Sequence, residues 1–505
     1  MSALSKGVTE KSDLFLKFRR KAFRNVSWFF EDFLEHPLLP WQYRMINAIL
    51  DPARKAFNVK TVINHSAKPR ITARSCHGTG KTTAMAAIAH IWTFIFANVR
   101  VVATAPKQDQ LLRRLMPRYR DILRSAPSAY QNIVEVMGRD VYIAGAKDWG
   151  LSLETASDPD SLAGFHDEPQ LILVDEASSK KLDPLFQVLE GALTTKGSVI
   201  AEIGNPTRMS GEFYQHHNRK DLDNLYYRMH IKHTDAGELI SNNWIESMRI
   251  KYGEESPIFK IRVGGDFADF DEATLTPLEL IEEAYDSDLE DDGSIPKLLI
   301  SVDVMDGGED STVITAAKKY DTYMDALEQS CHRYKASKSP IESAKQAIRV
   351  FHKFGGRKDE DYFIVDANGC GAGCAGYLME KGYIVVRHVG GESSNDPTRY
   401  RNRRVQNYIT CSEFFQNGKV KIDKDKFEDI EQFEMEMVTV KRKPGDDSKI
   451  DDIQTAEEVK KDLNGVSPDK ASSFTMLFHG ELPETHTAPS GDTYIVQSAL
   501  INEYF

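Results

Sequence analysis

Cysteine is scarce in this sequence, and that scarcity excludes one class of protein. The 505 residues include five cysteines, which are scattered along the chain. Five are too few for a disulfide framework, and an odd number favours a reducing compartment. The spacing of Cys370 and Cys374 would suit a metal, but no second Cys or His pair is placed to complete a zinc site.

The sequence also lacks the patterns that are typical of a signal peptide and of a membrane-spanning segment. Residues 1–15 contain no apolar stretch of the kind that signal peptides carry. The longest uncharged apolar stretch, residues 82–99, approaches the length of a membrane span. It contains His90 and Asn98, however, and it follows a phosphate-loop pattern. We therefore expect a buried helix here and no membrane association.

An excess of positive charge is absent as well. Lys and Arg total 64 against 76 Asp and Glu, a net charge of −12, which excludes a uniformly basic protein that coats nucleic acid. A local basic groove remains compatible with nucleic-acid binding. Hydrophobic residues make up 41% of the chain and aromatic residues 10%, so the chain is not mainly disordered. Its length predicts about two to four domains.

Short apolar strands alternate with helical patterns twice along the chain. Strands that end at polar or glycine-containing loops are typical of the parallel sheets of α/β domains. The acidic stretch 286–297 separates the two alternations and is the best linker. The expected divisions are an N-terminal arm 1–35, a first domain 36–285, a linker 286–297, a second domain 298–480 and a polar, irregular tail 481–505. The expected strands are 70–74, 99–106, 171–177, 198–206, 297–304, 311–319, 362–369 and 383–389, with helices over 340–354, 401–416 and 425–438.

A phosphate-binding loop is predicted at RSCHGTGKTT, residues 74–83, between a strand and a helix. The Walker A pattern asks for Gly, four residues, and Gly-Lys-Ser/Thr, and here Ser75 replaces the leading glycine. The two later glycines allow the loop amides to curl around phosphate. Lys81 is expected to reach the β- and γ-phosphates of ATP, and Thr82 to hold Mg²⁺. The predicted nucleotide-binding residues of this segment are Ser75, Gly78, Gly80, Lys81, Thr82 and Thr83.

Two later strands end in polar residues that suit the same site. LILVDEA has the Walker B form, in which Asp175 belongs to the Mg²⁺ shell and Glu176 polarises the attacking water. IGNPT ends the next strand, and Asn205 or Thr207 is expected to sense the γ-phosphate. The alternative for IGNPT is a simple proline turn.

Residues on either side of the loop have two interpretations each. Arg74 precedes the loop, and its guanidinium would either neutralise charge in the transition state or form a surface salt bridge. Trp41 and Gln42 lie upstream in a helix that Pro40 opens. They would either stack on and read adenine, or pack that helix against the domain.

Carboxylates at three element ends predict a metal site in the second domain. Asp303 and Asp366 come late in apolar strands, and Asp469 starts a helix. Phosphodiester hydrolysis with two metal ions needs oxygen ligands for Mg²⁺ or Mn²⁺, which explains aspartate rather than His or Cys. Asp310, in the turn that follows Asp303, is a fourth candidate. Each Asp alone also suits a turn or a helix cap.

Basic segments accompany these elements. RYRNRRVQNY (399–408), VKRKPGDDSK (440–449) and RRLMPRYRDILR (113–124) each carry several basic residues. They would hold DNA phosphates, or they are solvated surfaces.

Together these motifs, in this order, resemble the large terminase subunits of tailed double-stranded DNA phages. The resemblance runs from LPWQ (39–42) through ARSCHGTGKT, TAPKQDQ, LILVDEA, IGNPT, YGEESPIFKIRVGGDF, SVDVMDGGEDST, IVDANGCGAG and YRNRRVQNY to SPDKASS (467–473). It implies an α/β fold with an N-terminal ASCE-type P-loop ATPase on a parallel sheet and a C-terminal ribonuclease-H-like nuclease.

The resemblance also assigns roles by position. Arg74 resembles the arginine of the family's loop, and GNPT resembles the motif that couples hydrolysis to movement. Asp303, Asp366 and Asp469 resemble the nuclease ligands. The sequence departs from the family in the last motif. In the family this motif usually ends in a later Asp, and here Ser472 stands at that position. Either Asp469 supplies the third metal ligand, or the metal site is weakened.

The implied function is a packaging motor. It would use ATP and Mg²⁺, with Mn²⁺ able to replace Mg²⁺ in the nuclease, to drive double-stranded DNA through the portal into a procapsid and to cut concatemeric DNA. Implied partners are portal, procapsid and small terminase subunit, in a homo-oligomeric ring, commonly of five, with a monomer in isolation. The place of action is the host cytoplasm and, transiently, the portal vertex, not the mature virion. The alternatives are a helicase-nuclease and a non-catalytic binding protein.

Overall fold

The computed structural model divides the chain into two compact units, Met1–Asp269 and Phe270–Phe505. The division precedes the expected linker 286–297, because helix α13 (Leu278–Tyr285) packs on elements of the second unit. The Tyr285 hydroxyl, for example, donates a 2.8 Å hydrogen bond to Glu434. The described residues are 15–107, 111–155, 167–268, 273–285, 287–304, 311–334, 339–443, 450–480, 482, 484–487 and 493–496.

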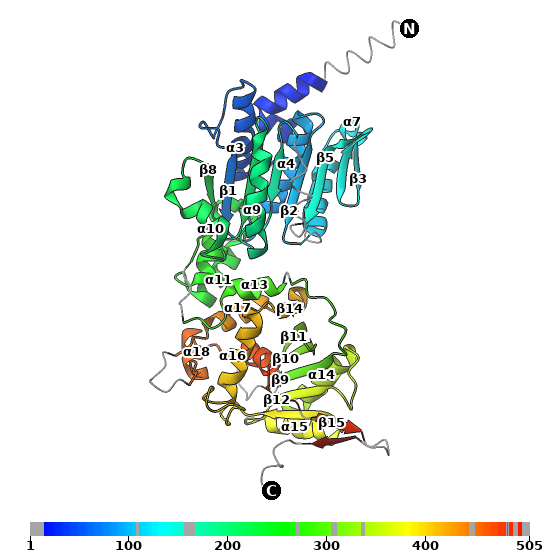
Figure 1. Ribbon diagram of the computed structural model, residues 1–505, viewed down its shortest axis with the longest axis vertical. Coiled ribbons are helices and arrows are strands. Elements are labelled where there is room, and N and C mark those ends of the chain that lie inside the picture. Colours follow the sequence, from blue (N-terminus) through cyan, green and yellow to red (C-terminus); the bar gives the residue numbers. More distant parts are fainter. Residues whose placement is uncertain are drawn as a thin grey trace. The chain divides into compact units, whose positions relative to one another are not determined.

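The first unit is built on an eight-stranded sheet with a parallel centre (Figure 1). Its order is β3-β4-β5-β2-β6-β7-β1-β8, and all five strands from β2 to β8 in that order pair in parallel. One strand, β7, thus separates the phosphate-loop strand β1 from the acidic strand β6, which is the ASCE arrangement. The strands are β1 (Arg70–Ser75), β2 (Arg100–Ala105), β3 (Val134–Met137), β4 (Asp140–Ile143), β5 (Ala146–Thr155), β6 (Leu171–Val174), β7 (Val199–Gly204) and β8 (Tyr226–Ile231).

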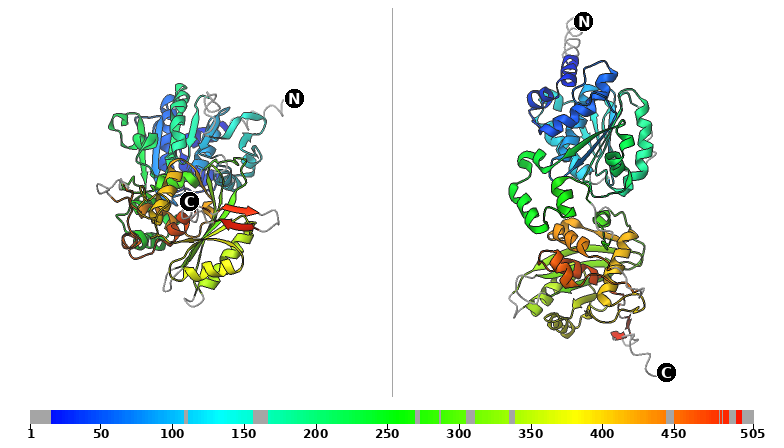
Figure 2. Two further views of the ribbon diagram at one scale, coloured as in Figure 1. Left: turned by 60° about the horizontal axis from the view of Figure 1, so that its bottom comes forward. Right: turned by 90° about the vertical axis from the view of Figure 1, so that its left-hand side faces the viewer.

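Helices cover both faces of this sheet (Figure 2). Helices α3, α4 and α6 share one core with the sheet, whereas α9 and α10 pack in a second core on the other face. The apolar residues 84–95 are all buried in α4, as expected, and no helix among the described residues is long and apolar enough to cross a membrane. The helices are α3 (Pro40–Ala56), α4 (Lys81–Ile95), α6 (Met116–Ser125), α7 (Ser128–Gln131), α9 (Asp183–Leu189), α10 (Gly211–Asn218) and α11 (Asn242–Tyr252). Shorter turns are α2 (Val26–Trp28), η1 (Phe29–Phe33), η2 (Leu111–Leu115), η3 (Lys180–Leu182), η4 (Glu190–Thr194), η5 (Lys220–Leu222), η6 (His233–Leu239), α12 (Pro257–Phe259) and η7 (Lys260–Gly264).

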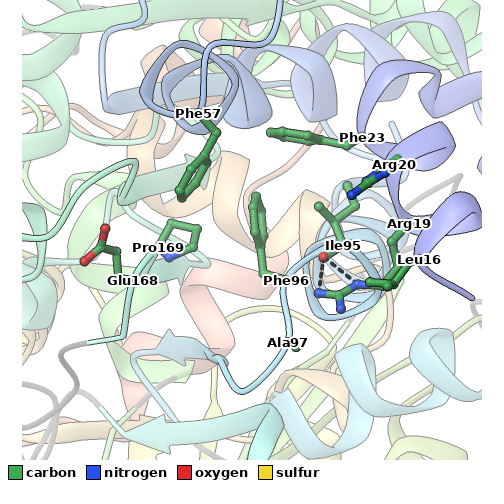
Figure 3. A pocket seen from close by; sticks show the side chains of 10 residues that line it. All are labelled: Leu16, Arg19, Arg20, Phe23, Phe57, Ile95, Phe96, Ala97, Glu168 and Pro169. Carbon is green, nitrogen blue, oxygen red and sulfur yellow. Dashed lines mark hydrogen bonds between the residues drawn. The ribbon is translucent and has the colours of Figure 1, made fainter. Parts of the chain in front are cut away.

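A surface hollow of about 340 Å³ lies between the helical segment 15–24 and the end of α4 (Figure 3). Arg19 closes the last turn of α4, because its Nε donates a 2.7 Å hydrogen bond to the Ile95 carbonyl. Phe23, Phe57 and Phe96 line the hollow. Since α4 begins at the predicted phosphate loop, the hollow lies at the opposite end of the helix from the predicted nucleotide site.

A buried ion pair fixes the connection from α3 to β1. The two Asp51 oxygens accept hydrogen bonds of 2.7–2.9 Å from the backbone amides of residues 62, 63 and 64 and from Arg54. Both side chains are fully buried. The carboxylate therefore organises the loop that leads into β1.

We expect Asp51→Asn to lower the free energy of unfolding of the first unit by about 3–5 kcal/mol, because it leaves Arg54 as an unpaired buried charge. Urea unfolding of the full chain measures this loss. Asp121→Asn is the matched control, because Asp121 pairs with Arg118 and Arg124 on the surface and such pairs contribute less than about 1 kcal/mol. Equal effects of the two substitutions would contradict the role of Asp51.

The second unit contains a six-stranded sheet of order β13-β12-β9-β10-β11-β14. Strands β9, β10 and β11 form an antiparallel meander, and β12 and β13 continue from β9 in parallel. This is the ribonuclease-H-like order. The strands are β9 (Lys297–Asp303), β10 (Thr312–Lys319), β11 (Met324–His332), β12 (Tyr362–Asp366), β13 (Ile384–His388) and β14 (Val420–Ile422).

Helices pack on both faces of this sheet too. Residues of α14 and α15 share a core with Ile300, Val302 and Val365 on one face. On the other face, α19 packs on β9 and β10 and is flanked by α16 and α17. The helices are α14 (Ser339–Lys353), α15 (Gly371–Glu380), α16 (Arg403–Gln416), η9 (Lys424–Lys426), α17 (Ile430–Thr439), α18 (Ala456–Asp462) and α19 (Asp469–Met476).

The predicted strands and helices are present within a few residues of their expected bounds, and the α/β fold class is confirmed. Strands β3, β4, β5, β8, β11 and β14 were not predicted; β8 is half-buried over most of its length, and β11 mixes apolar and polar residues without a regular alternation. The expected irregular tail is partly wrong, because β15 (Glu484–Thr487) and β16 (Thr493–Val496) form an antiparallel pair. β16 consists of Thr, Tyr, Ile and Val, which favour strands, and two of the four residues of β15 are Thr.

Candidate nucleotide and metal sites

The phosphate loop joins β1 to α4 at the carboxyl edge of the first sheet. Gly78 and Gly80 have φ values of 73° and 83°, a backbone conformation that favours glycine. The first hydrogen bond of α4 runs from the Ala84 amide to the Gly80 carbonyl, so the amides at the start of the helix, including those of Thr82 and Thr83, precede its ladder. A helix start of this kind attracts phosphate.

Asn205 connects this loop to the neighbouring strand β7. Gly204 lies opposite Arg74 in the parallel register, which places Asn205 beside Ser75. Its Nδ2 donates a 2.7 Å hydrogen bond to the Ser75 carbonyl, and its Oδ1 accepts a 3.0 Å hydrogen bond from Lys81 Nζ. Lys81 also donates to the Cys76 carbonyl at 3.3 Å. The ammonium group is thus held at the mouth of the loop.

Ser75, in place of the leading glycine, hydrogen-bonds within the loop. Its hydroxyl lies 2.7 Å from the Thr79 hydroxyl and donates to the Cys76 carbonyl at 3.1 Å. The first half of the loop is also held from outside, because the Cys76 amide donates to Ile231 on β8. The curled loop therefore forms without the leading glycine.

Trp41 and Gln42 support the loop from α3. Trp41 Nε1 donates to the Thr79 carbonyl at 3.2 Å, and Gln42 Nε2 donates to the Gly80 carbonyl at 3.0 Å. The other end of the Gln42 amide accepts from the Leu39 backbone at 2.8 Å. Both side chains are 2% exposed. This geometry favours the packing interpretation of the two residues over adenine recognition.

The acidic pair lies at the end of β6, next to the loop. The Asp175 amide continues the sheet by donating to the Thr104 carbonyl, and the Glu176 amide donates to Asp175 Oδ1 at 2.9 Å. Burial, followed by the neighbouring Glu176 charge, raises the pKa of Asp175. Burial lowers the pKa of Lys81, and the charge of Asp175 opposes that shift. A lysine and a carboxylate that lie within electrostatic reach of each other suit the triphosphate and its magnesium ion.

Arg74 forms a salt bridge in this structure. Its Nη2 lies 3.1 Å from Asp266 Oδ1 and 3.2 Å from His230 Nδ1. Its guanidinium also stacks over Phe267 at 5.6 Å from the ring centre. This is the salt-bridge interpretation of Arg74. Thr207, the other candidate in IGNPT, donates to the Ser178 hydroxyl at 3.3 Å instead of contacting the loop lysine.

In the second unit, the sheet register brings Asp303 and Asp366 together. Val302 on β9 pairs with Val365 on β12, so the two aspartates occupy the next positions on neighbouring parallel strands. Such positions lie about 5 Å apart and share one face of the sheet. Asp366 is oriented by Asn368, whose amide and Nδ2 donate to its Oδ1 at 3.1 and 2.9 Å. Burial raises the pKa of Asp366.

Asp469 begins α19, the helix that packs on β9 and β10. It shares a face of α19 with Ser473, one turn later, whose hydroxyl lies 3.1 Å from that of Ser301 on β9 and 2.8 Å from that of Thr315 on β10. The next residue, Lys470, donates to Cys331 Sγ at 3.1 Å on β11. No group of three potential metal ligands is already gathered among the described residues. Asp310 lies outside the described residues.

The strand pairing also places His388 beside Asp366, and this histidine was not predicted from the sequence. It ends β13 and lies opposite Asp366 in the parallel register. It is 6% exposed, and its Nδ1 has no hydrogen-bond partner within the described part of the chain. Burial lowers its pKa to about 3, so the imidazole is neutral. Its sequence signal was its place at the end of an apolar strand, the same place that Asp366 has.

The predicted basic segments are largely paired with acidic neighbours. Arg399 pairs with Glu413, and Arg401 pairs with Asp452 at 2.8 Å. Residues 444–449 of the expected basic hairpin lie outside the described residues. Arg114, in the third basic segment, contacts Glu176 rather than pointing away from the site.

A buried carboxylate also stabilises the start of α19. Pro468 precedes this helix and provides no side-chain cap. Glu436 of α17 takes over that role, since its Oε2 accepts a 2.9 Å hydrogen bond from the Ala471 amide while its Oε1 accepts from Gln432 at 3.0 Å. Burial raises the pKa of Glu436 to about 8 from an ordinary value of 4.5.

The second unit is therefore expected to lose stability as pH rises. A carboxyl with a raised pKa binds its proton more tightly in the folded state, so its contribution is complete below pH 4.5 and is lost as pH rises through about 8. The largest possible contribution is about 5 kcal/mol, because the pKa of Glu436 rises from 4.5 to about 8. Hydrogen exchange of α17 and α19 in the full chain at pH 5 and pH 8.5 measures the effect.

Glu436→Gln is expected to remove this pH dependence, whereas Glu431→Gln, a half-buried position on the same helix, keeps it. If the difference in hydrogen-exchange protection between wild type and Glu436→Gln is the same at both pH values, the pH dependence does not arise from Glu436.

Known proteins that are similar to this chain include phage large terminase subunits and a part of one. No family model matches the chain. A probable terminase large subunit of Enterobacteria phage P7 is 26% identical over 459 residues, which cover 84% of this chain and 88% of that protein. Among solved structures, the large terminase of a thermophilic bacteriophage in complex with ATP-γ-S covers 87% of this chain and 98% of its own, with a TM-score of 0.40 and 13% identity. The nuclease domain of the large terminase subunit gp2 of bacterial virus Sf6 covers 41% of this chain and 100% of its own, with a TM-score of 0.35 and 18% identity. Over most of its length, the chain is similar to a phage large terminase subunit.

Proposed function

We propose that this chain, as a relative of phage large terminase subunits, is a DNA-packaging ATPase and nuclease. It hydrolyses ATP to drive double-stranded DNA through the portal into a procapsid, and it cuts concatemeric DNA at the start and end of packaging. The observation that carries the proposal is that one polypeptide holds both a phosphate loop beside an acidic strand end and two aspartates in register on a ribonuclease-H-like sheet.

The ATPase chemistry follows from the loop and its neighbours. Lys81 Nζ would bind the β- and γ-phosphate oxygens of ATP, and Thr82 with Asp175 would hold Mg²⁺. Glu176 orients and polarises the water that attacks the γ-phosphorus. Asn205, already hydrogen-bonded to Lys81, is placed to respond when the γ-phosphate leaves. Arg74 reaches the site only after leaving Asp266.

The nuclease chemistry fits the carboxylates of the second unit. Asp303 and Asp366 present adjacent oxygen donors, the ligand type that Mg²⁺ and Mn²⁺ prefer. When bound, two such ions activate a water and stabilise the leaving oxygen of a phosphodiester. Asn368 holds Asp366 in position for this, and Asp469 or Asp310 would complete the ligand set.

The proposed partners follow from the same function. They are double-stranded DNA, the portal and procapsid, and a small terminase subunit, with the chain in a ring of five on the capsid and monomeric in isolation. The proposed place of action is the host cytoplasm, with transient residence at the portal vertex.

The test measures ATP turnover and duplex cleavage with the full chain. We expect linear duplex DNA to stimulate ATP hydrolysis, and closed circular DNA to be cut with Mg²⁺ or Mn²⁺ but not in EDTA. Unwinding of a forked duplex would favour a helicase-nuclease instead. Background turnover with and without DNA would favour a non-catalytic binding protein.

A further inference from the structure

One arginine at the start of α16 has no acidic partner in the described part of the chain. Arg399 and Arg401, just before this helix, both pair with carboxylates. Arg404 instead donates from Nη1 to the Gln454 carbonyl at 2.6 Å, and its guanidinium lies 4.8 Å from the ring centre of Tyr408. Its Nη2 is buried and has no hydrogen-bond partner among the described residues. A buried cation without an anion is costly, so Arg404 points to an anionic ligand.

Arg404 and His388 lie on either side of the same glycine. The Arg404 amide donates to the Gly390 carbonyl at 3.0 Å, and a Cβ at Gly390 would lie 3.3 Å from Arg404 Cβ and 3.6 Å from His388 Nε2. His388 is 6% exposed, and its Nδ1 also has no hydrogen-bond partner within the described ranges. A Cβ at the next residue, Gly391, would meet no described atom within 4 Å beyond its neighbours in the chain. Two unpartnered nitrogen atoms therefore belong to adjacent side chains beside an open turn.

The charges around His388 favour an anion over a cation. Burial lowers the pKa of His388 most, and the charges of His479, Arg403 and Arg404 lower it further. The rings of His388 and His479 lie 5.9 Å apart between their centres. Because these neighbours are all cationic or can become so, a metal ion would be repelled here and a phosphate would be attracted.

This cationic cluster lies next to the predicted metal site. His388 is opposite Asp366 in the parallel register, and Asp303 follows on the next strand. Residues in register share one face of a sheet, and neighbouring strands lie about 5 Å apart. Metal-binding oxygens and cationic nitrogens are thus side by side, at a spacing comparable with that of consecutive phosphates along a nucleic-acid strand.

We propose that Arg404 and His388 bind a backbone phosphate of the DNA strand that is cut at Asp303 and Asp366, next to the cleaved phosphate. The inference rests on the proposed nuclease function. Arg404 donates to the phosphate from Nη2, and His388 donates from an imidazole N–H. Such contacts recognise the charge of the strand and not its bases, so they suit cleavage with little sequence preference.

The first test measures the salt dependence of DNA nicking by the full chain. Arg404→Gln is expected to lower kcat/KM for closed circular DNA with Mn²⁺ about 10- to 100-fold, the range for a lost charged hydrogen bond. The slope of log kcat/KM against log salt concentration is expected to become shallower by about one, because one phosphate contact is lost. Arg401→Gln is the matched control, since Arg401 pairs with Asp452 on the surface, and it is expected to stay within about two-fold. A wild-type slope for Arg404→Gln would overturn the inference.

A conservative variant separates charge from support of the fold. Arg404→Lys keeps the positive charge and loses the planar guanidinium, so it is expected to keep the wild-type salt slope while kcat/KM falls. If Arg404 only supported the Gln454 backbone, the Lys and Gln variants would share one slope, and that result would overturn the proposal.

The second test separates phosphate binding from metal binding. Mn²⁺ is expected to raise the Tm of wild type, Arg404→Gln and His388→Asn alike, because neither side chain is a metal ligand. Loss of this Tm gain in either variant would overturn the inference. The two substitutions together are expected to cost less than the sum of their separate effects on log kcat/KM, because both remove contacts to one phosphate, and full additivity would contradict a shared phosphate.

The outcomes also distinguish this inference from the function on which it rests. If wild type cuts DNA with Mn²⁺ but Arg404→Gln keeps both the rate and the slope, the phosphate site fails alone. If wild type cuts no DNA with either metal, the proposed nuclease fails and the phosphate site fails with it.

Discussion

Replacement of Lys81 by alanine is expected to abolish ATP turnover and to leave metal-dependent DNA cleavage intact. The ammonium group is the cation that the loop itself supplies to the phosphates, and Asn205 and the Cys76 carbonyl hold it in place. Removing one preorganised donor from a transition state costs about 10²- to 10³-fold in rate, and removing this full charge costs at least that much. Steady-state ATP hydrolysis with linear duplex DNA measures the loss.

Two controls make this result specific. Lys196→Ala removes an exposed lysine of the same unit, which lies over Phe57, and is expected to keep turnover. Cleavage of closed circular DNA by the same Lys81→Ala preparation shows that the second unit is still folded. ATP hydrolysis at the wild-type rate by Lys81→Ala would mean that the nucleotide site lies elsewhere.

Five of the residues found from the sequence share one property, which is their place at the end of a buried strand or in the short loop that follows it. They are Lys81, Asp175, Asn205, Asp303 and Asp366. Parallel strands bring their carboxyl ends to one edge of a sheet, so local pattern was sufficient to place these residues near each other. The strand register then gives the spacing of these residues. Val302 pairs with Val365, for example, so Asp303 and Asp366 occupy adjacent positions on neighbouring strands.

Other features could not be predicted from the local sequence pattern, because they depend on contacts between residues that lie far apart in the chain. The contact between Arg114 and Glu176 spans 62 residues, and Arg114 looks like any other member of a basic helix. The choice between the two interpretations of Gln42 needed the same kind of information, because only the packing of α3 shows that both ends of its amide are occupied. Strand β11 escaped notice because half of its residues are polar, a pattern that loops share.

The position of Asp469 shows the same limit in the second unit. Its motif predicted a third ligand, and no strand pairing places Asp469 relative to Asp303 and Asp366, because it begins the helix α19, which packs on β9 and β10. Asp303 and Asp366, which lie on paired strands, therefore provide the sharper test of the cleavage site.

Replacement of Asp303 by asparagine is expected to remove cleavage and to leave ATP turnover unchanged. Asparagine keeps the size of the side chain but loses the charge and one oxygen ligand. Substitution of a residue that only contacts a metal ligand already costs about 10- to 100-fold in metal affinity or activity. Loss of a direct ligand is therefore expected to lower the rate at which closed circular DNA is nicked by at least about 100-fold. Asp321→Asn, on the exposed turn before β11, is the matched control.

Thermal unfolding separates a lost ligand from a damaged fold. Asp303 and Asp366 are neighbouring like charges, so without metal Asp303→Asn relieves repulsion and the variant is expected to be at least as stable as wild type. Mn²⁺ binds the folded site and not the unfolded chain, so it raises the Tm of wild type and of Asp321→Asn but not that of Asp303→Asn. A variant that still gains Tm with Mn²⁺ and still cuts DNA would show that the ions bind elsewhere. A variant that loses stability without metal would show that Asp303 supports the sheet rather than the chemistry.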